Sequence, residues 1–104
     1  MGFEISNFSG DGKYQLIIGN ETINFQKENI YNLYLIDNNR IAYNRTRTVK
    51  EENHSEYQVA DLIIYNFRTD EEEVVIGQGE IVGTSPDGKI IYFMTNQKFL
   101  LPVT

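Results

Sequence analysis

The stretch "DLIIYNFRTDEEEVV", from Asp61 to Val75, decides the class of fold. Apolar and aromatic residues fill the segment Tyr57–Phe67, a polar turn follows at Arg68–Glu71, and a second apolar run returns at Glu73–Ile76. Short runs of β-branched and aromatic residues, broken by Asn, Asp and Thr, are typical of strands joined by turns. We therefore expect a strand, a tight turn and a returning strand, with "DLIIYNF" the most buried part.

The same pattern continues outward in both directions, and helical periodicity is nearly absent. Gly19-Asn20 and Asp37–Arg40 are expected tight turns, because Gly and Asn accept positive φ at little cost. The sequence predicts one domain over residues 1–104, an all-β antiparallel meander of about ten short strands. The expected strands are Phe3–Phe8, Tyr14–Ile18, Thr22–Phe25, Ile30–Ile36, Ile41–Val49, Tyr57–Phe67, Glu73–Ile76, Glu80–Thr84, Lys89–Thr95 and Lys98–Val103.

Composition excludes several kinds of site and partner. The chain has 104 residues and no cysteine, which excludes disulfides, zinc–thiolate sites and thiol nucleophiles. The net charge is −6, and residues 51–104 carry ten Asp and Glu against three Lys and Arg. Nucleic acids and anionic membranes need a basic footprint, so neither is an expected partner.

Hydropathy and composition bear on the compartment and the source of the chain. No apolar run is long enough to span a bilayer, and no signal-peptide pattern is present, which favours the cytoplasm without fixing the compartment. The wealth of Ile, Asn, Lys and Tyr is typical of an AT-rich coding genome, such as that of a Firmicute or its phage.

A turn motif occurs twice, in "FSGDGKYQLII" from Phe8 and in "TSPDGKIIYFM" from Thr84. Calcium would need further convergent acids, and an Asp-box would need one more residue between Asp and Gly. Each residue instead has a role in the turn: Pro sets φ, Asp accepts from backbone N–H groups, and Gly takes the positive-φ corner. The expected structural turn residues are Ser9, Asp11, Gly12, Ser85, Pro86, Asp87 and Gly88.

The order of strand, Ser-Pro-Asp-Gly-Lys turn and strand resembles the WD40-like repeat of TolB-type and dipeptidyl-peptidase-IV-type β-propellers. Ser85–Lys89 match that repeat fully, Ser9–Lys13 match with Gly10 in place of proline, and parts of Asp61–Glu72 match its later strand. Asp37–Arg45 reads as a degenerate third copy. The resemblance implies a blade-like construction over about two-thirds of the chain.

The chain is short for a propeller, since it holds about two and a half blades of the usual length and propellers usually close with at least four. Three arrangements follow. The chain is a piece of a larger propeller, or several copies associate, or blade-like hairpins pack as a compact sandwich or barrel. The size and the complete-looking termini favour the compact sandwich or barrel.

No constellation of residues indicates catalysis. His54 is the only histidine, and it lies in the charged segment "KEENHSE", where a triad could not be held in place. No pair of carboxylates stands in an apolar setting that would suit glycoside hydrolysis. Neither a metal-ligand spacing nor a glycine-rich phosphate loop is present. We therefore expect no enzyme activity, no metal and no cofactor.

Two charged surfaces are the candidate binding sites. In "YNRTRTVK" the period of a strand places Arg45 and Arg47 on one face, and arginine and tyrosine are favoured anchors of protein interfaces. The alternative is a plain polar face on an exposed hairpin. The acidic run Asp70, Glu71, Glu72 and Glu73 is either a solvated turn that protects a strand edge or a docking surface for a basic partner. The candidate interface residues are Arg40, Arg45, Arg47, Lys50, Tyr43 and Tyr57.

The leading hypothesis is a non-enzymatic, protein-binding β module, of the kind used by small acidic inhibitors and immunity-type proteins. The alternative is a β-propeller segment that serves as a scaffold or as the gating domain of a larger hydrolase. Association of copies through open strand edges is a further expectation.

Overall fold

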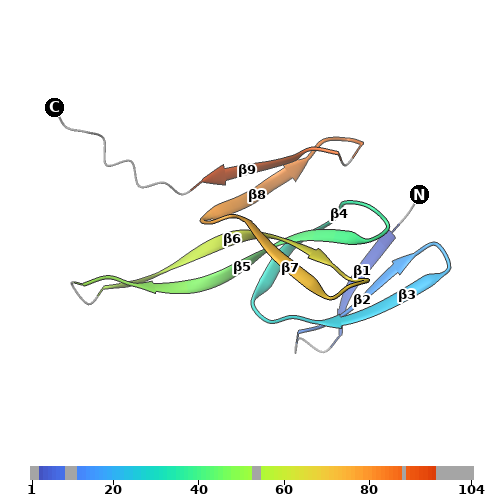
Figure 1. Cartoon of the computed structure of the whole chain (residues 1–104), viewed down its shortest axis with the longest axis horizontal. Helices are drawn as coiled ribbons and strands as arrows, with labels where there is room; N and C mark the ends of the chain where they lie inside the picture. The colour runs from blue at the N-terminus through green and yellow to red at the C-terminus, as the bar shows by residue number, and fades with distance from the viewer. Residues whose placement is uncertain (1–2, 9–11, 53–54, 88, 96–104) are drawn as a thin grey trace.

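The computed structural model describes residues 3–8, 12–52, 55–87 and 89–95, and these residues form nine strands and no helix. The strands make three antiparallel sheets, each a simple meander in chain order. In Figure 1 the sheets follow one another as layers, with β1–β3 at the lower right, β4–β7 in the middle and β8–β9 at the top. We call them the first sheet, the central sheet and the β8–β9 hairpin.

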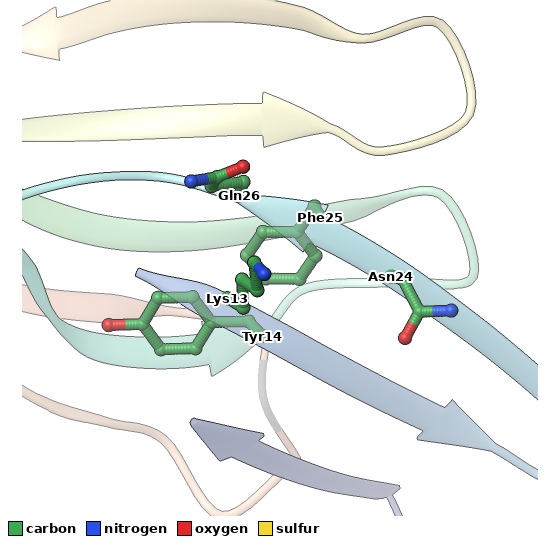
Figure 2. A pocket seen from close by; sticks show the side chains of 5 residues that line it. All are labelled: Lys13, Tyr14, Asn24, Phe25 and Gln26. Carbon is green, nitrogen blue, oxygen red and sulfur yellow. The ribbon is translucent and has the colours of Figure 1, made fainter. Parts of the chain in front are cut away.

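The first sheet contains β1 (Phe3–Phe8), β2 (Lys13–Ile18) and β3 (Glu21–Gln26). The two-residue turn Gly19-Asn20 joins β2 to β3, as the sequence predicts, and Gly19 has φ of +58°. Tyr14 and Phe25 face each other across these strands, and their rings stack at 5.4 Å (Figure 2). This pair lies on the face that turns toward the central sheet.

The central sheet contains β4 (Ile30–Leu35), β5 (Arg40–Lys50), β6 (Glu56–Asn66) and β7 (Glu71–Ile76). The long pair β5 and β6 forms its middle, and β4 and β7 are its edges. Both edge strands carry an irregularity, between Tyr31 and Tyr34 on β4 and opposite Leu62 and Ile63 on β7. Such bulges bend and twist a strand locally.

The last layer is a two-stranded hairpin of β8 (Gly79–Thr84) and β9 (Ile91–Thr95). The predicted turn lies between these strands in the chain, and Ser85–Asp87 are its described residues. A two-stranded hairpin is marginally stable by itself in water, so packing on the central sheet must hold it in place.

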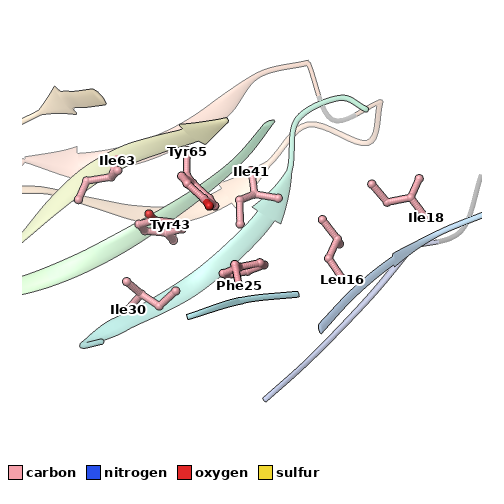
Figure 3. Packing of buried hydrophobic residues seen from close by; sticks show 8 residues of the cluster. All are labelled: Leu16, Ile18, Phe25, Ile30, Ile41, Tyr43, Ile63 and Tyr65. Atoms are coloured by element: carbon pink, nitrogen blue, oxygen red, sulfur yellow. The ribbon is translucent and has the colours of Figure 1, made fainter. Parts of the chain in front are cut away.

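The larger core lies between the first sheet and the central sheet. Strand alternation sends Ile41, Tyr43, Ile63 and Tyr65 to one face of β5 and β6, where they meet Leu16, Ile18 and Phe25 (Figure 3). The Phe25 and Tyr65 rings lie 5.7 Å apart. This cluster has eight buried members, which makes it the main source of hydrophobic stabilisation. The buried members are Leu16, Ile18, Phe25, Ile30, Ile41, Tyr43, Ile63 and Tyr65.

The opposite face of the central sheet carries a smaller core. Ala42 and Leu62 are buried there against Ile81 of β8, with partly buried apolar residues around them. Both faces of the central sheet are therefore covered, one by the first sheet and the other by the β8–β9 hairpin.

The predicted fold class is confirmed, because the described chain is all-β and antiparallel and its sheets are meanders. Of the closed forms considered, a barrel does not fit, since the described strands divide into three separate sheets. Most strand boundaries agree with the sequence to within two residues. The expected strand Lys98–Val103 lies outside the described residues.

Candidate functional site

The second copy of the repeated turn is held by its own side chains. Ser85 is buried, and its hydroxyl donates to Asp87 Oδ1 at 2.5 Å. The same Asp87 oxygen accepts from Lys89 N at 3.1 Å, and Ser85 Oγ accepts from Ile90 N at 3.0 Å. Hydrogen bonds from Ser85 and from the Lys89 backbone hold the pKa of Asp87 below its usual value. Asp87 thus accepts from a backbone N–H group, as expected, and Ser85 connects Asp87 to the Ile90 N–H.

Gly12 is the described glycine of the first copy. Its φ is +82°, and its carbonyl accepts from Lys27 N at 2.9 Å. A Cβ at this position would stand 2.6 Å from the Lys27 carbonyl oxygen, so both the conformation and the space require glycine. Ser9, Asp11 and Gly88 lie outside the described residues.

The structure separates the four cations of the expected basic patch. Arg45 and Arg47 lie on the same face of β5, as predicted, and pair with Asp61 and Val59 of β6. Arg40 and Lys50 belong to the other face by the same alternation, and they stand at the two ends of the strand. Arg40 is engaged locally, because its guanidinium donates to Asp37 Oδ2 at 2.8 Å.

Arg45 belongs to a polar cluster with Tyr43 of its own strand and with residues of two other segments, β7 and the segment after β3. Its guanidinium donates to Glu72 Oε2 at 2.5 Å, Tyr43 donates its hydroxyl to the same oxygen, and Lys27 Nζ lies 3.7 Å from Glu72 Oε1. Burial raises the pKa of Glu72, but hydrogen bonds from Arg45 and Tyr43 outweigh burial and leave that pKa below its usual value. Tyr43 is completely buried in the larger core, so its expected place on an exposed patch is wrong.

Arg47 is the more accessible arginine, with a side chain 49% exposed. Its Nε donates to Asp61 Oδ2 at 2.7 Å, while Asp61 Oδ1 accepts from Gln78 N at 2.9 Å. Asp61 thus links β5 to the turn between β7 and β8. Burial raises the pKa of Asp61, and the Arg47 and Gln78 hydrogen bonds more than offset it, so the pKa is lowered.

The outer part of the β5–β6 pair extends beyond its neighbours. The pairing of β4 ends at Ile30 opposite Arg45, and that of β7 ends at Ile76 opposite Leu62. Beyond these points Arg47–Lys50 pair only with Glu56–Val59 among the described residues. We call these two segments the distal ribbon; they project to the left in Figure 1. The distal ribbon carries three of the expected interface residues, namely Arg47, Lys50 and Tyr57.

The acidic run divides into two environments. Glu71 and Glu73 are exposed on β7, an edge strand, where charge discourages pairing with other chains. Asp70 and Glu72 are engaged within the chain, since Asp70 Oδ1 accepts from the Tyr65 hydroxyl at 2.7 Å. Burial, and then the Asp70 hydrogen bond, raise the pKa of Tyr65. All four residues are exposed, but Arg45 and Tyr65 engage Glu72 and Asp70, and we call Glu71 and Glu73 the open acidic surface.

Sequence reasoning missed a buried polar junction at Asn44. Its amide donates to the carbonyls of Asp61 at 3.1 Å and Gly79 at 2.7 Å. Its Oδ1 accepts from Ile81 N at 2.8 Å and from Asn32 Nδ2 at 3.1 Å. The side chain is fully satisfied and holds the start of β8 against β5. Asn32 stands in the β4 irregularity with φ of +55°, a conformation that asparagine adopts more readily than most residues.

Sequence reasoning also missed a concentration of exposed apolar side chains. Among the described residues, all the large hydrophobic side chains that are clearly exposed lie on β7–β9 or in the turn before β9. Exposed apolar patches of this kind commonly mark interaction surfaces. The residues are Val74, Val75, Val82, Ile90, Tyr92, Phe93 and Met94.

The cavities of the described structure are shallow. One of about 400 Å³ lies over β2 and β3, where Lys13, Asn24 and Gln26 surround the Tyr14–Phe25 pair (Figure 2). Another, of about 270 Å³, lies between the central sheet and β9 and is lined by apolar residues including Ile64 and Phe93. Neither contains a nucleophile beside a base, which acyl or glycosyl transfer would need.

The described residues contain no group of three or more His, Cys, Asp or Glu arranged to hold a metal ion. No helix able to cross a membrane is found among them. His54 lies outside the described residues.

Comparison of the chain with known protein families, with curated proteins and with solved structures finds no match.

Proposed function

We propose that the chain is a non-enzymatic, protein-binding β module whose partner docks on the distal ribbon. The observation that carries the proposal is that Arg47–Lys50 and Glu56–Val59 extend past both edge strands and pair only with each other among the described residues. A two-stranded ribbon gains stability when further strands or a partner cover it. Its outer backbone groups are also available for strand addition.

The side chains of the distal ribbon suit a protein surface. Arg47 is half exposed and held in one direction by its hydrogen bond to Asp61, so little conformational freedom is lost when a partner binds. Lys50 is exposed at the end of β5, and Tyr57 is partly exposed one strand away. Arginine and tyrosine are enriched among residues that dominate binding energy. Aromatic, arginine and lysine side chains on one projecting element favour a protein partner over a small molecule.

The test is capture of a partner from an extract of the source cells, followed by binding of the purified partner to purified variants. Charge reversal of Arg47→Glu and Lys50→Glu together should weaken binding by at least about 30-fold, as expected for loss of dominant contacts. Arg40→Glu is the control, since Arg40 lies at the other end of β5 and, like Arg47, is paired with one carboxylate. Arg45 is left unchanged, because it holds the partly buried cluster of Glu72, Tyr43 and Lys27.

Partner affinity that is equal in the double reversal and in the Arg40→Glu control would refute the distal ribbon as the docking site. Far-ultraviolet circular dichroism of each variant verifies that the sheets remain folded. Turnover of an ester or glycoside panel by the purified chain, abolished by substitution of one carboxylate, would refute the non-enzymatic assignment.

The second candidate is a β-propeller segment that acts as a scaffold or a gating domain. It is favoured by one feature, the face-to-face stacking of three meander sheets, which is how neighbouring blades pack. A segment of a larger propeller should aggregate when isolated, because its terminal layers would expose core faces. A soluble species of defined mass on light scattering would argue against this candidate.

A further inference from the structure

The outer face of the β8–β9 hairpin is apolar and uncovered among the described residues. Ile81, on the inner face, is 3% exposed, whereas Val82, Tyr92 and Met94 are 56%, 52% and 64% exposed. Tyr92 and Met94 lie opposite Gly83 and Glu80 in the pairing, and so alternate with the inner residues Ile91 and Phe93. The hairpin thus presents to solvent the type of side chain that the chain elsewhere covers with another sheet.

The opposite end of the stack has a different character. Among the side chains that the structure describes, the outer face of the first sheet carries charged, hydroxyl and amide groups, with partly buried Ile17 as the apolar exception. A polar terminal layer is what stacked proteins use as a cap. Head-to-tail stacking of copies would bury these polar groups against Tyr92 and Met94, which is unfavourable. The polar residues include Glu4, Lys13, Gln15, Thr22, Asn24 and Gln26.

The small charge of the outer face of the β8–β9 hairpin limits the kind of surface that could cover it. Among the described residues of β8 and β9, Glu80 is the one carboxylate, and it lies beside the Tyr31 hydroxyl of β4. Burial, and then this carboxylate, raise the pKa of Tyr31. Lys89 lines the groove between the hairpin and the central sheet. The open acidic surface is elsewhere, on β7. The face therefore has little charge with which to recruit a charged partner, and it matches a surface that is equally uncharged and apolar.

We infer that two copies of this chain associate through the outer faces of their β8–β9 hairpins. Such a contact is isologous, so Val82, Tyr92 and Met94 of each copy meet the same residues around a two-fold axis. The resulting dimer is a stack of six layers, three from each copy. The polar outer face of a first sheet then lies at each end of the stack. The inference goes beyond the proposed function, because the distal ribbon stays outside this contact and free for a different partner.

The test is the mass of the full chain by sedimentation velocity over a range of concentrations. The wild type should form a dimer, and Tyr92→Lys/Met94→Lys should raise the dimer dissociation constant by at least about 30-fold, because a lysine on each copy places like charges across the contact. The matched control, Thr22→Lys/Asn24→Lys, adds the same charges to the outer face of the first sheet and should leave the dissociation constant unchanged.

A second readout locates the contact directly. The chain has two methionines, so methyl-labelled Met94 gives a resolvable signal. In a mixture of labelled and unlabelled chains, this methyl group should show intermolecular nuclear Overhauser effects to aromatic protons.

A wild type that stays monomeric at every concentration would overturn the inference. It would also be overturned by a dimer that Tyr92→Lys/Met94→Lys does not weaken, a result that would point instead to the open strand edges. If Arg47→Glu/Lys50→Glu loses partner binding but still dimerises, the partner surface on the distal ribbon and the dimer contact on the β8–β9 hairpin are separate sites.

Discussion

Single buried residues decide how the layers of this molecule are joined. Asn44 is a polar side chain with no exposed surface, and it makes four hydrogen bonds to three other strands. Removing one partner from such a site leaves the others buried and unsatisfied, which costs more than a hydrogen bond contributes. The attachment of β8 therefore depends more on Asn44 than on any exposed residue.

We predict that Asn44→Ala lowers the free energy of unfolding by about 3 kcal/mol, since the carbonyl of Gly79 and the N–H of Ile81 lose their side-chain partner. Urea denaturation measures the change. Asn24→Ala makes the same substitution on an exposed residue of β3 and should stay within ~0.5 kcal/mol of the wild type. Equal losses in the two variants would contradict the role assigned to Asn44.

This junction could not be predicted from the sequence. The period of a strand gives the face on which Asn44 lies, but only the packing of β8 on that face makes the side chain buried. The same limit explains Tyr43. It shares a face of β5 with Arg45 and Arg47, as the alternation requires, yet the first sheet covers the face at Tyr43 and leaves it open at Arg47. Alternation is local, whereas coverage depends on strands far away in the sequence.

At the scale of elements, turns were the most predictable parts, because Gly, Asn and Asp act on the backbone beside them. Gly19 and Gly12 show that a turn can require glycine to different extents. Both have positive φ, but a Cβ on Gly19 would meet nothing within 4 Å, whereas one on Gly12 would meet a backbone oxygen at 2.6 Å. The first turn needs glycine for its conformation alone, and the second also needs the space.

We predict that Gly19→Ala costs about 1 kcal/mol, the usual penalty for an alanine in the left-handed region. Gly12→Ala should cost a further ~1–3 kcal/mol, as expected of an overpacked contact, because the backbone of Lys27 must move. Thermal and urea unfolding of the pair give the difference. If the two variants proved equally stable, the close approach of Gly12 to Lys27 would be disproved.

A second feature at this scale is the polar cluster around Glu72, which attaches two segments to β5: strand β7 and the segment that follows β3. Glu72 receives hydrogen bonds from Arg45 and Tyr43 and lies beside Lys27, and these contacts leave its pKa below the ordinary value of 4.5. A carboxyl with a lowered folded pKa contributes stability that is present above the unfolded pKa and is lost as the pH falls through the folded pKa.

We therefore expect Glu72→Gln to be less stable than the wild type at neutral pH, and the difference in unfolding free energy to close as the pH falls below 4.5 and through the lowered pKa of Glu72 in the folded state. Urea denaturation at a series of pH values measures it. Glu71→Gln, on the exposed edge next to it, should follow the wild type throughout. A gap between Glu72→Gln and the wild type that stays constant with pH would show that the carboxylate charge does not hold this junction.

At the scale of the whole molecule, the fold class and the positions of the strands along the chain followed from the sequence, while the order of the strands in space and the division into three stacked sheets did not. Runs such as Ile41–Val49 mark strands because their β-branched and aromatic residues act locally. Nothing local distinguishes the turn at Asp37–Arg40, which keeps two strands in one sheet, from the turn at Gly77-Gln78, after which the chain begins a new layer. That choice depends on the two cores, which form between distant segments.

The two cores differ in size, and this difference should appear in the dynamics. Among the described residues, eight buried apolar side chains join the first sheet to the central sheet, whereas the buried apolar cluster under the β8–β9 hairpin has three, Ala42, Leu62 and Ile81. Regions with less buried apolar surface open at lower free energy than the global unfolding transition. The hairpin should therefore detach before the rest of the molecule unfolds.

Native-state hydrogen exchange tests this. We predict that the protected amides of β8 exchange through an opening of lower free energy than those of β6. Asn44→Ala should accelerate amide exchange in β8 further, whereas the exchange rates in β2 should change only as much as the global free energy of unfolding changes. The reason is that Asn44 bonds to Gly79 and Ile81 on the face of β5 opposite the one that packs on the first sheet. Exchange of β8 and β6 through one common opening, in the wild type and in Asn44→Ala alike, would mean that the three layers unfold as a single cooperative unit.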